Sequence, residues 1–291
     1  MLDFLIIIPA YNEEKYIAKT LDSLVQQTHI PAQIILVDDN STDETASIVQ
    51  SFVNDYDFIK LINRRSKSES LPGAKVVQAF YEGLANADKN YDVVCKFDAD
   101  LVFPHDYLDK LNDGFTSDAN LGMLGGVCMI MQNQEWKMES LTNLDHIRGA
   151  LKAYRKDCFE QIGGLKKAMG WDTLDELLAR YHGWKVEVAS HLKVQHLKPT
   201  GTTYSQKLPL QFGKSVYQMR YKLLISLLAI SKLSKKKKSY SFFLLACYGY
   251  VKAVLQNEKP LVTPKEGKFI RQYRMQSIKK RLKTEKRQAS S

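Results

Sequence analysis

Two aspartates that follow a short apolar run are the residues of this chain best suited to chemistry. Residues 93–97 are rich in strand-forming side chains, and Asp98 and Asp100 come after them. Because residues i and i+2 of a strand point to the same face, the two carboxylates can converge at the carboxyl end of the strand, where open α/β sheets bind ligands. Carboxylate oxygens are preferred ligands of Mg²⁺ and Mn²⁺. A solvated acidic turn is the alternative, since Asp-x-Asp alone is a common pattern.

A second acidic pair, Asp38 and Asp39, follows another apolar run at residues 33–37. The polar stretch after it is typical of a loop that caps a helix, and capping accounts for Ser41 and Thr42. It accounts less well for two adjacent aspartates after a buried strand, because like charges repel each other. One of these carboxylates could instead accept a hydrogen bond from a ring N–H of a nucleobase.

Strands and helices are expected to alternate along the first hundred residues. Apolar runs predict strands at 4–8, 33–37, 58–62 and 93–97. Apolar side chains at helical spacing predict helices within 17–25, 46–52 and 76–87, the first of them capped by Asn12. This alternation predicts an α/β fold with a doubly wound, Rossmann-like, mostly parallel sheet and helices on both faces. Both acidic pairs would then lie at one edge of the sheet.

Charge is divided unevenly along the chain. Residues 232–291 carry 17 Lys and Arg against 3 Glu, whereas the first 231 residues carry 25 basic and 29 acidic side chains. The four cysteines are widely separated and form no Cys-x-x-Cys, which predicts no zinc site or disulfide framework and favours a reducing compartment. The sequence shows neither a signal peptide nor an 18-residue apolar stretch, so we expect a cytoplasmic protein without a spanning helix.

The C-terminal part of the chain predicts a helical extension close to a membrane. Residues 209–231 predict a helix with an apolar end, and residues 242–255 form a second apolar segment. Lys235–Lys238 lies between them, which suits an interfacial helical hairpin whose lysines face anionic headgroups. The alternative is an ordinary helix pair, packed on the rest of the chain, with a solvated loop. Residues 268–287 predict a basic helix.

Several short motifs are spread over the first 165 residues. They are Pro9-Ala-Tyr-Asn-Glu-Glu, Val37-Asp-Asp-Asn-Ser-Thr-Asp, Phe97-Asp-Ala-Asp, Tyr154-Arg155 and the stretch from Phe159 to Leu165. In order and spacing they resemble the family 2 glycosyltransferases of GT-A fold, and the resemblance covers residues 3–200. It implies a bacterial-type, inverting enzyme that uses Mg²⁺ or Mn²⁺ to move a sugar from a nucleotide diphosphate to a hydroxyl acceptor. A UDP-sugar is the donor we expect.

The resemblance gives a role to each residue that matches the family's pattern. The nucleotide would lie against Pro9, Ala10, Tyr11, Glu13, Asp39, Lys75 and Asp98. Asp39 would contact the base and Asp98 the ribose or diphosphate, while Asp100, together with Asp98, would hold the metal ion. His196 would be a further metal or diphosphate contact, although a structural histidine fits the sequence equally well.

The catalytic base is implied by another motif. The family carries a Glu-Asp pair about a dozen residues before a Gly-aromatic turn, and counting back from Gly183-Trp184 places the pair at Trp171-Asp172. The chain departs from the family here, because Trp replaces Glu, but the aspartate is retained. We therefore expect Asp172 to be the base, with Asp175 as its competitor. The alternative is that both are simply acids favoured at a helix N-terminus.

These patterns predict a catalytic domain at 1–205 and a basic, helical extension at 206–291. Within the domain, 1–104 would bind the nucleotide and 105–205 the acceptor. The expected partners are a nucleotide-sugar donor, a glycan or lipid-linked acceptor, and an anionic membrane reached through 222–255, with no nucleic acid. The protein would then work on the inner face of the cell membrane, in the synthesis of cell-envelope glycans or glycolipids.

Two other functions compete with this one. A sugar nucleotidyltransferase would use the same sheet and Asp-x-Asp pattern, but it should carry a Gly- and Lys/Arg-rich phosphate loop after the first strand, where this chain has Tyr11-Asn-Glu-Glu. A non-catalytic protein could bind nucleic acid or a membrane through the basic tail. That function would leave the acidic motifs unused, and the tail has no recognised nucleic-acid motif.

Overall fold

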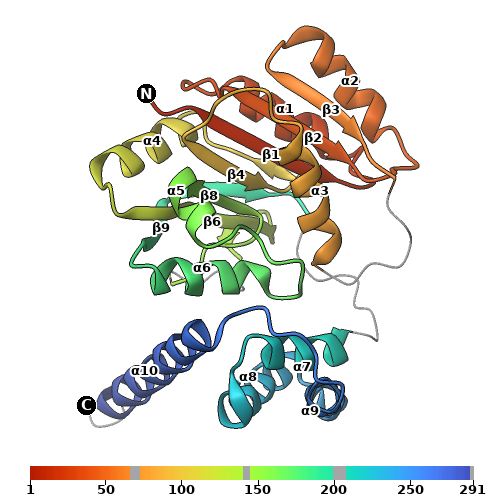
Figure 1. Cartoon of the computed structure of the whole chain (residues 1–291). Coiled ribbons are helices and arrows are strands. Elements are labelled where there is room, and N and C mark those ends of the chain that lie inside the picture. The colour runs from red at the N-terminus through yellow and green to blue at the C-terminus, as the bar shows by residue number, and fades with distance from the viewer. Residues whose placement is uncertain (66–72, 140–144, 199–207, 289–291) are drawn as a thin grey trace. The chain divides into compact units, whose positions relative to one another are not determined.

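The computed structural model describes residues 1–65, 73–139, 145–198 and 208–288 (Figure 1). The chain divides into two units. One comprises Met1–Lys167 with Trp171–Thr202, and the other Ala168–Gly170 with Thr203–Ser291. The predicted domain boundary at 205 lies outside the described residues, and the division of the first unit into donor and acceptor halves stays a prediction.

A nine-stranded sheet forms the centre of the first unit (Figure 1). Its strands are β1 Phe4–Ala10, β2 Gln33–Asp38, β3 Ile59–Asn63, β4 Val93–Phe97, β5 Leu101–Val102, β6 Leu121–Gln132, β7 Glu135–Met138, β8 Leu151–Arg155 and β9 Lys185–His196. Their order is β3-β2-β1-β4-β8-β6-β9-β5, with β7 paired to β6. The helices of this unit are α1 Ile17–Val25, α2 Thr45–Asp55, α3 Ala74–Ala85, α4 Tyr107–Ser117, α5 Lys156–Gln161 and α6 Trp171–Tyr181.

The N-terminal half of the sheet has the predicted parallel order. Strands β3, β2, β1 and β4 pair in parallel, and every residue of β2 is buried, so both faces of this strand are covered. Helix α3 lies against one face at very short range. A Cβ atom at Gly83 would lie only 2.7 Å from Cγ2 of Ile7 and 3.1 Å from Cγ2 of Val37. Glycine is therefore what lets this helix sit directly on β1 and β2.

The C-terminal half of the sheet is mixed rather than a continuation of the parallel pattern. Strand β8 is antiparallel to both β4 and β6, β5 is antiparallel to β9, and β6 and β9 are parallel. Strand β9 is one long strand over Lys185–His196. Its pairing with β6 shifts register between Gly125 and Val127, which lets a single strand follow its neighbour around an irregularity.

The start of α1 differs from the prediction. Asn12 does not cap this helix, because α1 begins only after Tyr16. Asn12 has a positive φ of 54°, and its side-chain oxygen accepts a hydrogen bond from the backbone N–H of Thr42 at 2.8 Å. A short polar side chain in the left-handed region here closes the loop after β1 onto the loop after β2.

The second unit is helical, with α7 Leu208–Gln218, α8 Lys222–Lys237, α9 Tyr240–Leu255 and α10 Pro264–Gln288. The single helix expected at 209–231 is broken, because Arg220 and Lys222 have positive φ angles of 55° and 58°. Helices α7 and α9 touch through glycine: a Cβ atom at Gly213 would collide with the carbonyl oxygen of Ala246. Within the described residues, no helix is both long and apolar enough to cross a membrane.

The sequence predicted that the tetralysine would lie between the two helices. It does not form a separate loop. Lys235, Lys236 and Lys237 lie in the last turn of α8, and Lys238 ends the helix in the left-handed conformation with a φ of 49°. Positive side chains are stabilising in this position, because the last turn of a helix carries the negative end of its dipole. Ser239 then begins α9, since its hydroxyl accepts a hydrogen bond from the N–H of Phe242.

Candidate active site

The loops after β1 and β2 are tied together by hydrogen bonds. The N–H of Asp39 donates to the carbonyl of Ala10 at 2.9 Å, and the N–H of Asn12 donates to the Ser41 hydroxyl at 2.9 Å. Glu13 is held in the same way, since its N–H donates to the Thr45 hydroxyl at 2.8 Å. The stretch that begins at Pro9 and Ala10 therefore lies beside the acidic loop after β2.

The two adjacent aspartates after β2 have different environments. Asp38 accepts hydrogen bonds from both the N–H and the hydroxyl of Ser41, so it closes its own loop. Asp39 is paired with Arg64, whose Nη1 lies 3.2 Å from Oδ1, and Arg64 in turn donates to Gln78 at 3.0 Å. Both carboxylates are buried. Separate partners thus reduce the repulsion that the sequence alone suggests.

The other residues predicted at the donor site lie around these loops. Tyr11 is 57% exposed at the end of β1, so its ring is open to a ligand. Lys75 is half-buried in the first turn of α3. Asp98 follows β4, the neighbour of β1 in the sheet, and its N–H donates to the carbonyl of Ala150 at 2.8 Å.

Asp98 is paired with a buried lysine. The ammonium group of Lys96 contacts Oδ1 of Asp98, donates to the carbonyl of Gly149 at 3.0 Å, and lies 5.7 Å from the centre of the Trp171 ring. The side chain of Lys96 is only 3% exposed, whereas that of Asp98 is 37% exposed. Asp98 is therefore the accessible member of the pair, while Lys96 supplies a positive charge from the interior.

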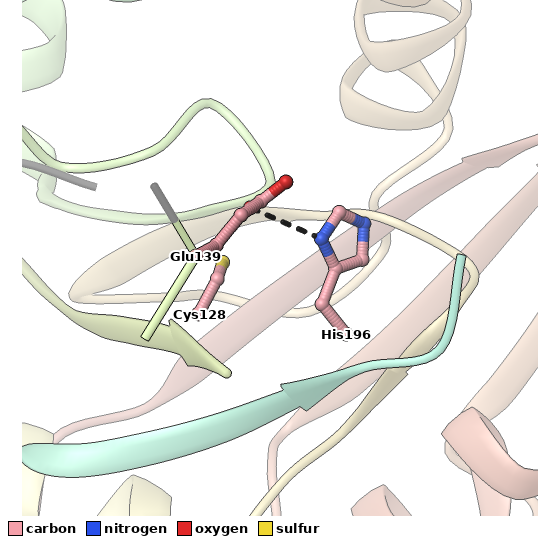
Figure 2. Close-up of side chains that lie close together, drawn as sticks. All are labelled: Cys128, Glu139 and His196. Carbon is pink, nitrogen blue, oxygen red and sulfur yellow. Dashed lines mark hydrogen bonds and ion pairs between the residues drawn. The ribbon is translucent and has the colours of Figure 1, made fainter. Parts of the chain in front are cut away.

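Asp100 is buried and faces His196. Oδ2 of Asp100 lies 3.4 Å from Nε2 of His196, and Nδ1 of the same ring lies 3.3 Å from Oε2 of Glu139 (Figure 2). Asp100 immediately precedes β5, whose first residue, Leu101, pairs with His196 of β9. Burial opposes protonation of His196, but its hydrogen bonds to the two carboxylates outweigh burial and raise its pKa to about 9.

Glu13 has an incompletely paired carboxylate at the same edge of the sheet. Its Oε1 is paired with Lys198 at 2.8 Å, but its Oε2 is buried and finds no hydrogen-bond partner among the described residues. Burial raises the pKa of Glu13, and the charges of Asp98 and Asp100 raise it further, although Lys198 opposes them. A buried oxygen without a partner, close to two further carboxylates, fits a divalent cation that Asp98, Asp100 and His196 would hold, with the ion replacing the proton on Nε2 of His196.

A second group of ligand-type atoms has another explanation. Cys128, Glu139 and His196 bring a sulfur, a carboxylate oxygen and a ring nitrogen within 4.8 Å of one another, and all three are buried (Figure 2). However, Glu139 already pairs with Arg148 at 3.2 Å, and burial raises the pKa of Cys128 to about 12. A cation here would have to displace Arg148 and deprotonate a buried thiol, so Glu139, His196 and Arg148 are better described as a network of hydrogen bonds and ion pairs with Cys128 beside it.

The expected base and its competitor sit in contrasting surroundings. Asp175 is buried, with Oδ1 2.9 Å from Nζ of Lys152 and Oδ2 accepting from the hydroxyl of Tyr154. Asp172, in the first turn of α6, keeps a third of its side chain exposed and lies 3.6 Å from Nε2 of His146. Burial favours the neutral form of Asp172, but His146 and Lys152 outweigh it and lower its pKa. Asp172 is therefore ionised and accessible.

Lys152 lies beneath these acids and is fully buried. Besides Asp175, its ammonium group contacts Oε1 of Glu176 at 2.9 Å and the carbonyl of Asp172. Burial and the nearby carboxylate of Glu176 raise the pKa of Asp175, whereas Lys152 and His146 outweigh burial at Glu176 and lower its pKa. This cluster fixes the start of α6 on β8 and so sets the position of Asp172.

Sequence reasoning missed four residues of this site: Lys96, Glu139, His146 and Lys152. Two of them left a signal, because lysines interrupt the apolar strands β4 and β8, and a buried lysine needs an acidic partner. The register places Lys96 and Lys152 opposite each other across these strands. Glu139 and His146 lie between elements and left no such pattern.

A separate cavity of about 510 Å³ opens between α1, β5 and β7, with Trp136, Gln195 and Val102 among its lining residues. Neighbouring residues of a strand point to opposite faces, so Gln195 faces this cavity whereas His196 faces Asp100. The cavity therefore lies across the sheet from the acidic cluster and is not part of the candidate site.

Comparison with known proteins identifies similar sequences. The family model described as "Glycosyl transferase family 2" matches residues 5–163. A probable glycosyltransferase of Bacillus subtilis, YdaM, is 28% identical over 194 residues, which cover 58% of this chain and 44% of YdaM. Poly-beta-1,6-N-acetyl-D-glucosamine synthase of Staphylococcus aureus is 28% identical over 122 residues, which cover 41% of this chain and 27% of the synthase. The chain spans less than half the length of these curated relatives.

Solved structures share the fold at low sequence identity. GalNAc-T7 with UDP, GalNAc and Mn²⁺ has a TM-score of 0.63 at 16% identity, over 84% of this chain and 56% of its own. TarS of S. aureus in complex with UDP-GlcNAc has a TM-score of 0.56 at 20% identity, over 77% and 66%. Mannosyltransferase PcManGT from Pyrobaculum calidifontis, with GDP-Man and Mn²⁺, has a TM-score of 0.55 at 14% identity, over 96% and 83%. These similarities confirm the expected GT-A-like α/β fold with C-terminal helices.

Replacement of Lys152 by Met tests the buried cluster. The change leaves Asp175 and Glu176 in the interior without their shared counter-charge, so we expect the free energy of unfolding to fall by about 3–5 kcal/mol. Urea titration followed by circular dichroism measures this. The matched control is Lys110→Met, because Lys110 is 46% exposed on α4 and should change stability by no more than about 0.5 kcal/mol. Equal effects of the two changes would contradict this account of the cluster.

Proposed function

Because the chain belongs to glycosyl transferase family 2, we propose that it is an inverting, metal-dependent glycosyltransferase that moves a sugar from a nucleotide diphosphate to a hydroxyl acceptor. One observation carries the proposal: Glu13, Asp98 and Asp100 gather at the carboxyl edge of the sheet, and one buried oxygen of Glu13 has no partner among the described residues. Such an edge suits a bound cation and the phosphates that a cation brings with it.

The nucleotide is assigned to the loops after β1, β2 and β4. Pro9, Ala10, Tyr11 and Glu13 would line its pocket, with the exposed Tyr11 ring as an open apolar surface. Asp39 would accept a hydrogen bond from the base, and its pairing with Arg64 holds the carboxylate in place for that purpose. Asp98 would contact the ribose or diphosphate, and Lys75 the nucleotide.

Asp98, Asp100 and His196 would hold Mg²⁺ or Mn²⁺. The ion would supply charge stabilisation for the nucleoside diphosphate that leaves. The GalNAc-T7 structure contains Mn²⁺ together with UDP, and the PcManGT structure contains Mn²⁺ together with GDP-Man, which supports this choice. Lys96 adds a second positive charge, which holds Asp98 in place from the interior.

Asp172 is the base that we assign to the acceptor hydroxyl. A sugar hydroxyl is a weak nucleophile and needs a carboxylate within hydrogen-bond reach to take its proton. Asp172 is ionised and a third exposed, whereas Asp175 is enclosed by Lys152 and Tyr154. One base suffices for a single in-line displacement, which inverts the anomeric carbon.

The donor and the pathway are proposed from relatives. UDP-sugars are favoured, because the TarS structure contains UDP-GlcNAc and the GalNAc-T7 structure contains UDP. Synthesis of a cell-envelope glycan or glycolipid is supported by the similarity to the poly-N-acetylglucosamine synthase of S. aureus. A hydroxyl of a glycan or lipid-linked glycan would then be the acceptor.

We further propose that residues 222–255 contact an anionic membrane on its inner face. Helix α8 exposes Leu223, Leu224, Leu227 and Leu228, and α9 exposes Tyr240, Leu244, Leu245, Tyr248, Val251, Val254 and Leu255. Exposed apolar residues in such number on two consecutive helices indicate an interaction site. The lysines at the end of α8 supply the charge that anionic headgroups attract, at about 1 kcal/mol each.

Calorimetric titration with UDP, GDP and dTDP, each with and without Mn²⁺, tests the donor site. We expect one nucleotide to bind in a metal-dependent way and Asp100→Ala to weaken that binding by about tenfold or more, because a direct metal ligand is lost. Asp57→Ala is the control, since Asp57 is exposed and precedes β3, at the opposite end of the parallel strands from the acidic motifs. Binding that is equally strong without Mn²⁺ and in Asp100→Ala would argue against the assignment.

Asp172→Asn and Asp175→Asn separate the two candidate bases. UDP release from UDP-GlcNAc is the rate to measure, with water as the acceptor. Asp172→Asn should lower kcat by about 10²–10⁴-fold and leave the urea midpoint nearly unchanged, because its role is to take a proton. Asp175→Asn should mainly lower the urea midpoint, because it disrupts a buried ion pair. The opposite result would transfer the role of base to Asp175.

Co-sedimentation with lipid vesicles tests the membrane contact. The protein should bind vesicles of phosphatidylglycerol more tightly than vesicles of phosphatidylcholine, and added salt should weaken the difference. Lys235→Ser with Lys236→Ser should remove most of this preference. Lys265→Ser with Lys268→Ser removes the same charge from exposed positions of α10 and should have a smaller effect. If both variants lost the preference for phosphatidylglycerol equally, the net charge of the protein would explain the binding, and a specific docking surface would not.

A further inference from the structure

We propose that Glu139 is a positioning residue that orients His196 toward the metal side of Asp100. The inference rests on the proposed function, in which His196 helps to hold the ion. It adds a residue that lies far from the acidic motifs in sequence and that touches neither donor nor acceptor in this assignment. It also explains why a carboxylate is buried behind the histidine.

The contacts form a chain through the interior. Oε2 of Glu139 lies 3.3 Å from Nδ1 of His196, and Nε2 on the other side of the ring lies 3.4 Å from Oδ2 of Asp100 (Figure 2 shows the first of these contacts). The side chains of Glu139 and His196 are 4% and 5% exposed. Water therefore has little access to compete for either ring nitrogen.

Glu139 is itself fixed in place. Its N–H donates to the carbonyl of Cys128 at 2.9 Å, just beyond the end of β7, and Oε2 lies 3.2 Å from Nη2 of Arg148. Arg148 balances the charge of the carboxylate, which a buried glutamate needs. Two contacts besides the imidazole thus hold Glu139: a hydrogen bond from its backbone N–H and an ion pair between its carboxylate and Arg148.

The backbone alone does not determine how the imidazole faces. Pairing of Leu101 with His196, and the hydrogen bond from the N–H of Leu197 to the carbonyl of Asp100, fix the main chain. The ring torsion of a histidine is broad and roughly two-fold, so a flipped ring would fit the same main chain. A carboxylate that accepts the Nδ1 proton fixes the orientation of the ring and leaves Nε2 directed at Asp100, where a metal ion would replace the Nε2 proton.

A purely structural role for Glu139 makes a different prediction. If the residue only neutralises Arg148, its replacement should lower stability without changing the affinity for metal. If it orients His196, the affinity should fall even where the fold is intact. Carboxylates behind metal-bound histidines typically contribute about 10–100-fold to metal affinity.

Electron paramagnetic resonance can measure the binding of Mn²⁺ in the presence of saturating UDP, and this affinity distinguishes the structural role of Glu139 from the orienting role. We expect Glu139→Gln to weaken Mn²⁺ binding by about 10–100-fold and His196→Ala to weaken it at least as much. Cys128→Ser is the matched control, because Cys128 belongs to the same cluster but bonds neither the ring nor Arg148 in this account, and it should bind Mn²⁺ as the wild type does. Urea unfolding of each variant reports the fold separately.

The outcomes separate the inference from the function on which it rests. Wild-type affinity in Glu139→Gln together with weak binding in His196→Ala would overturn the role of Glu139 alone. Wild-type affinity in His196→Ala would overturn the ligand assignment itself. If Glu139→Gln does not fold, Glu139→Gln with Arg148→Met removes both charges together, and wild-type Mn²⁺ affinity in that variant would equally overturn the proposal.

Discussion

Carboxylates that converge at the edge of the sheet repel one another unless positive or hydrogen-bonding groups lie close to them. Parallel strands end at this edge, so the motifs that follow them bring their acids together in a partly buried setting. Arg64 is the partner of Asp39, Lys96 of Asp98 and His196 of Asp100. Only Glu13 keeps a buried oxygen without a partner among the described residues. The balance of charge, more than any single motif, makes this edge suitable for a cation and phosphates.

The need for positive partners also separates the roles of the acids of α6. Lys152 gathers Asp175 and Glu176 in the interior, where removal of one partner would leave a buried charge. Because that cluster anchors the first turns of the helix, Asp172 can remain a third exposed and still be held by His146. Stability and reactivity are thereby assigned to different carboxylates that lie within one turn of each other. The proposed base depends on a neighbour that does no chemistry.

The helical unit depends on close helix packing and not on paired charges. Glycines at α7 and α9 let these helices approach closely, so the unit buries small residues between them and leaves several larger apolar side chains exposed. Such an arrangement is unfavourable in water unless the exposed side chains meet an apolar partner. These exposed apolar side chains are the basis of the proposed membrane contact.

The sequence by itself determined the parallel strands, their acidic ends and the family, because apolar runs and motif spacing are local properties of the chain. It also singled out Asp100 and Asp172 by pattern. The tertiary structure decided what local pattern cannot encode: the antiparallel β8, the break at Arg220, and the partners of each acid. Lys96, Lys152 and Glu139 meet their partners only because distant segments converge on them. A buried charge is stabilised by what surrounds it in space, and that neighbourhood exists only in the folded chain.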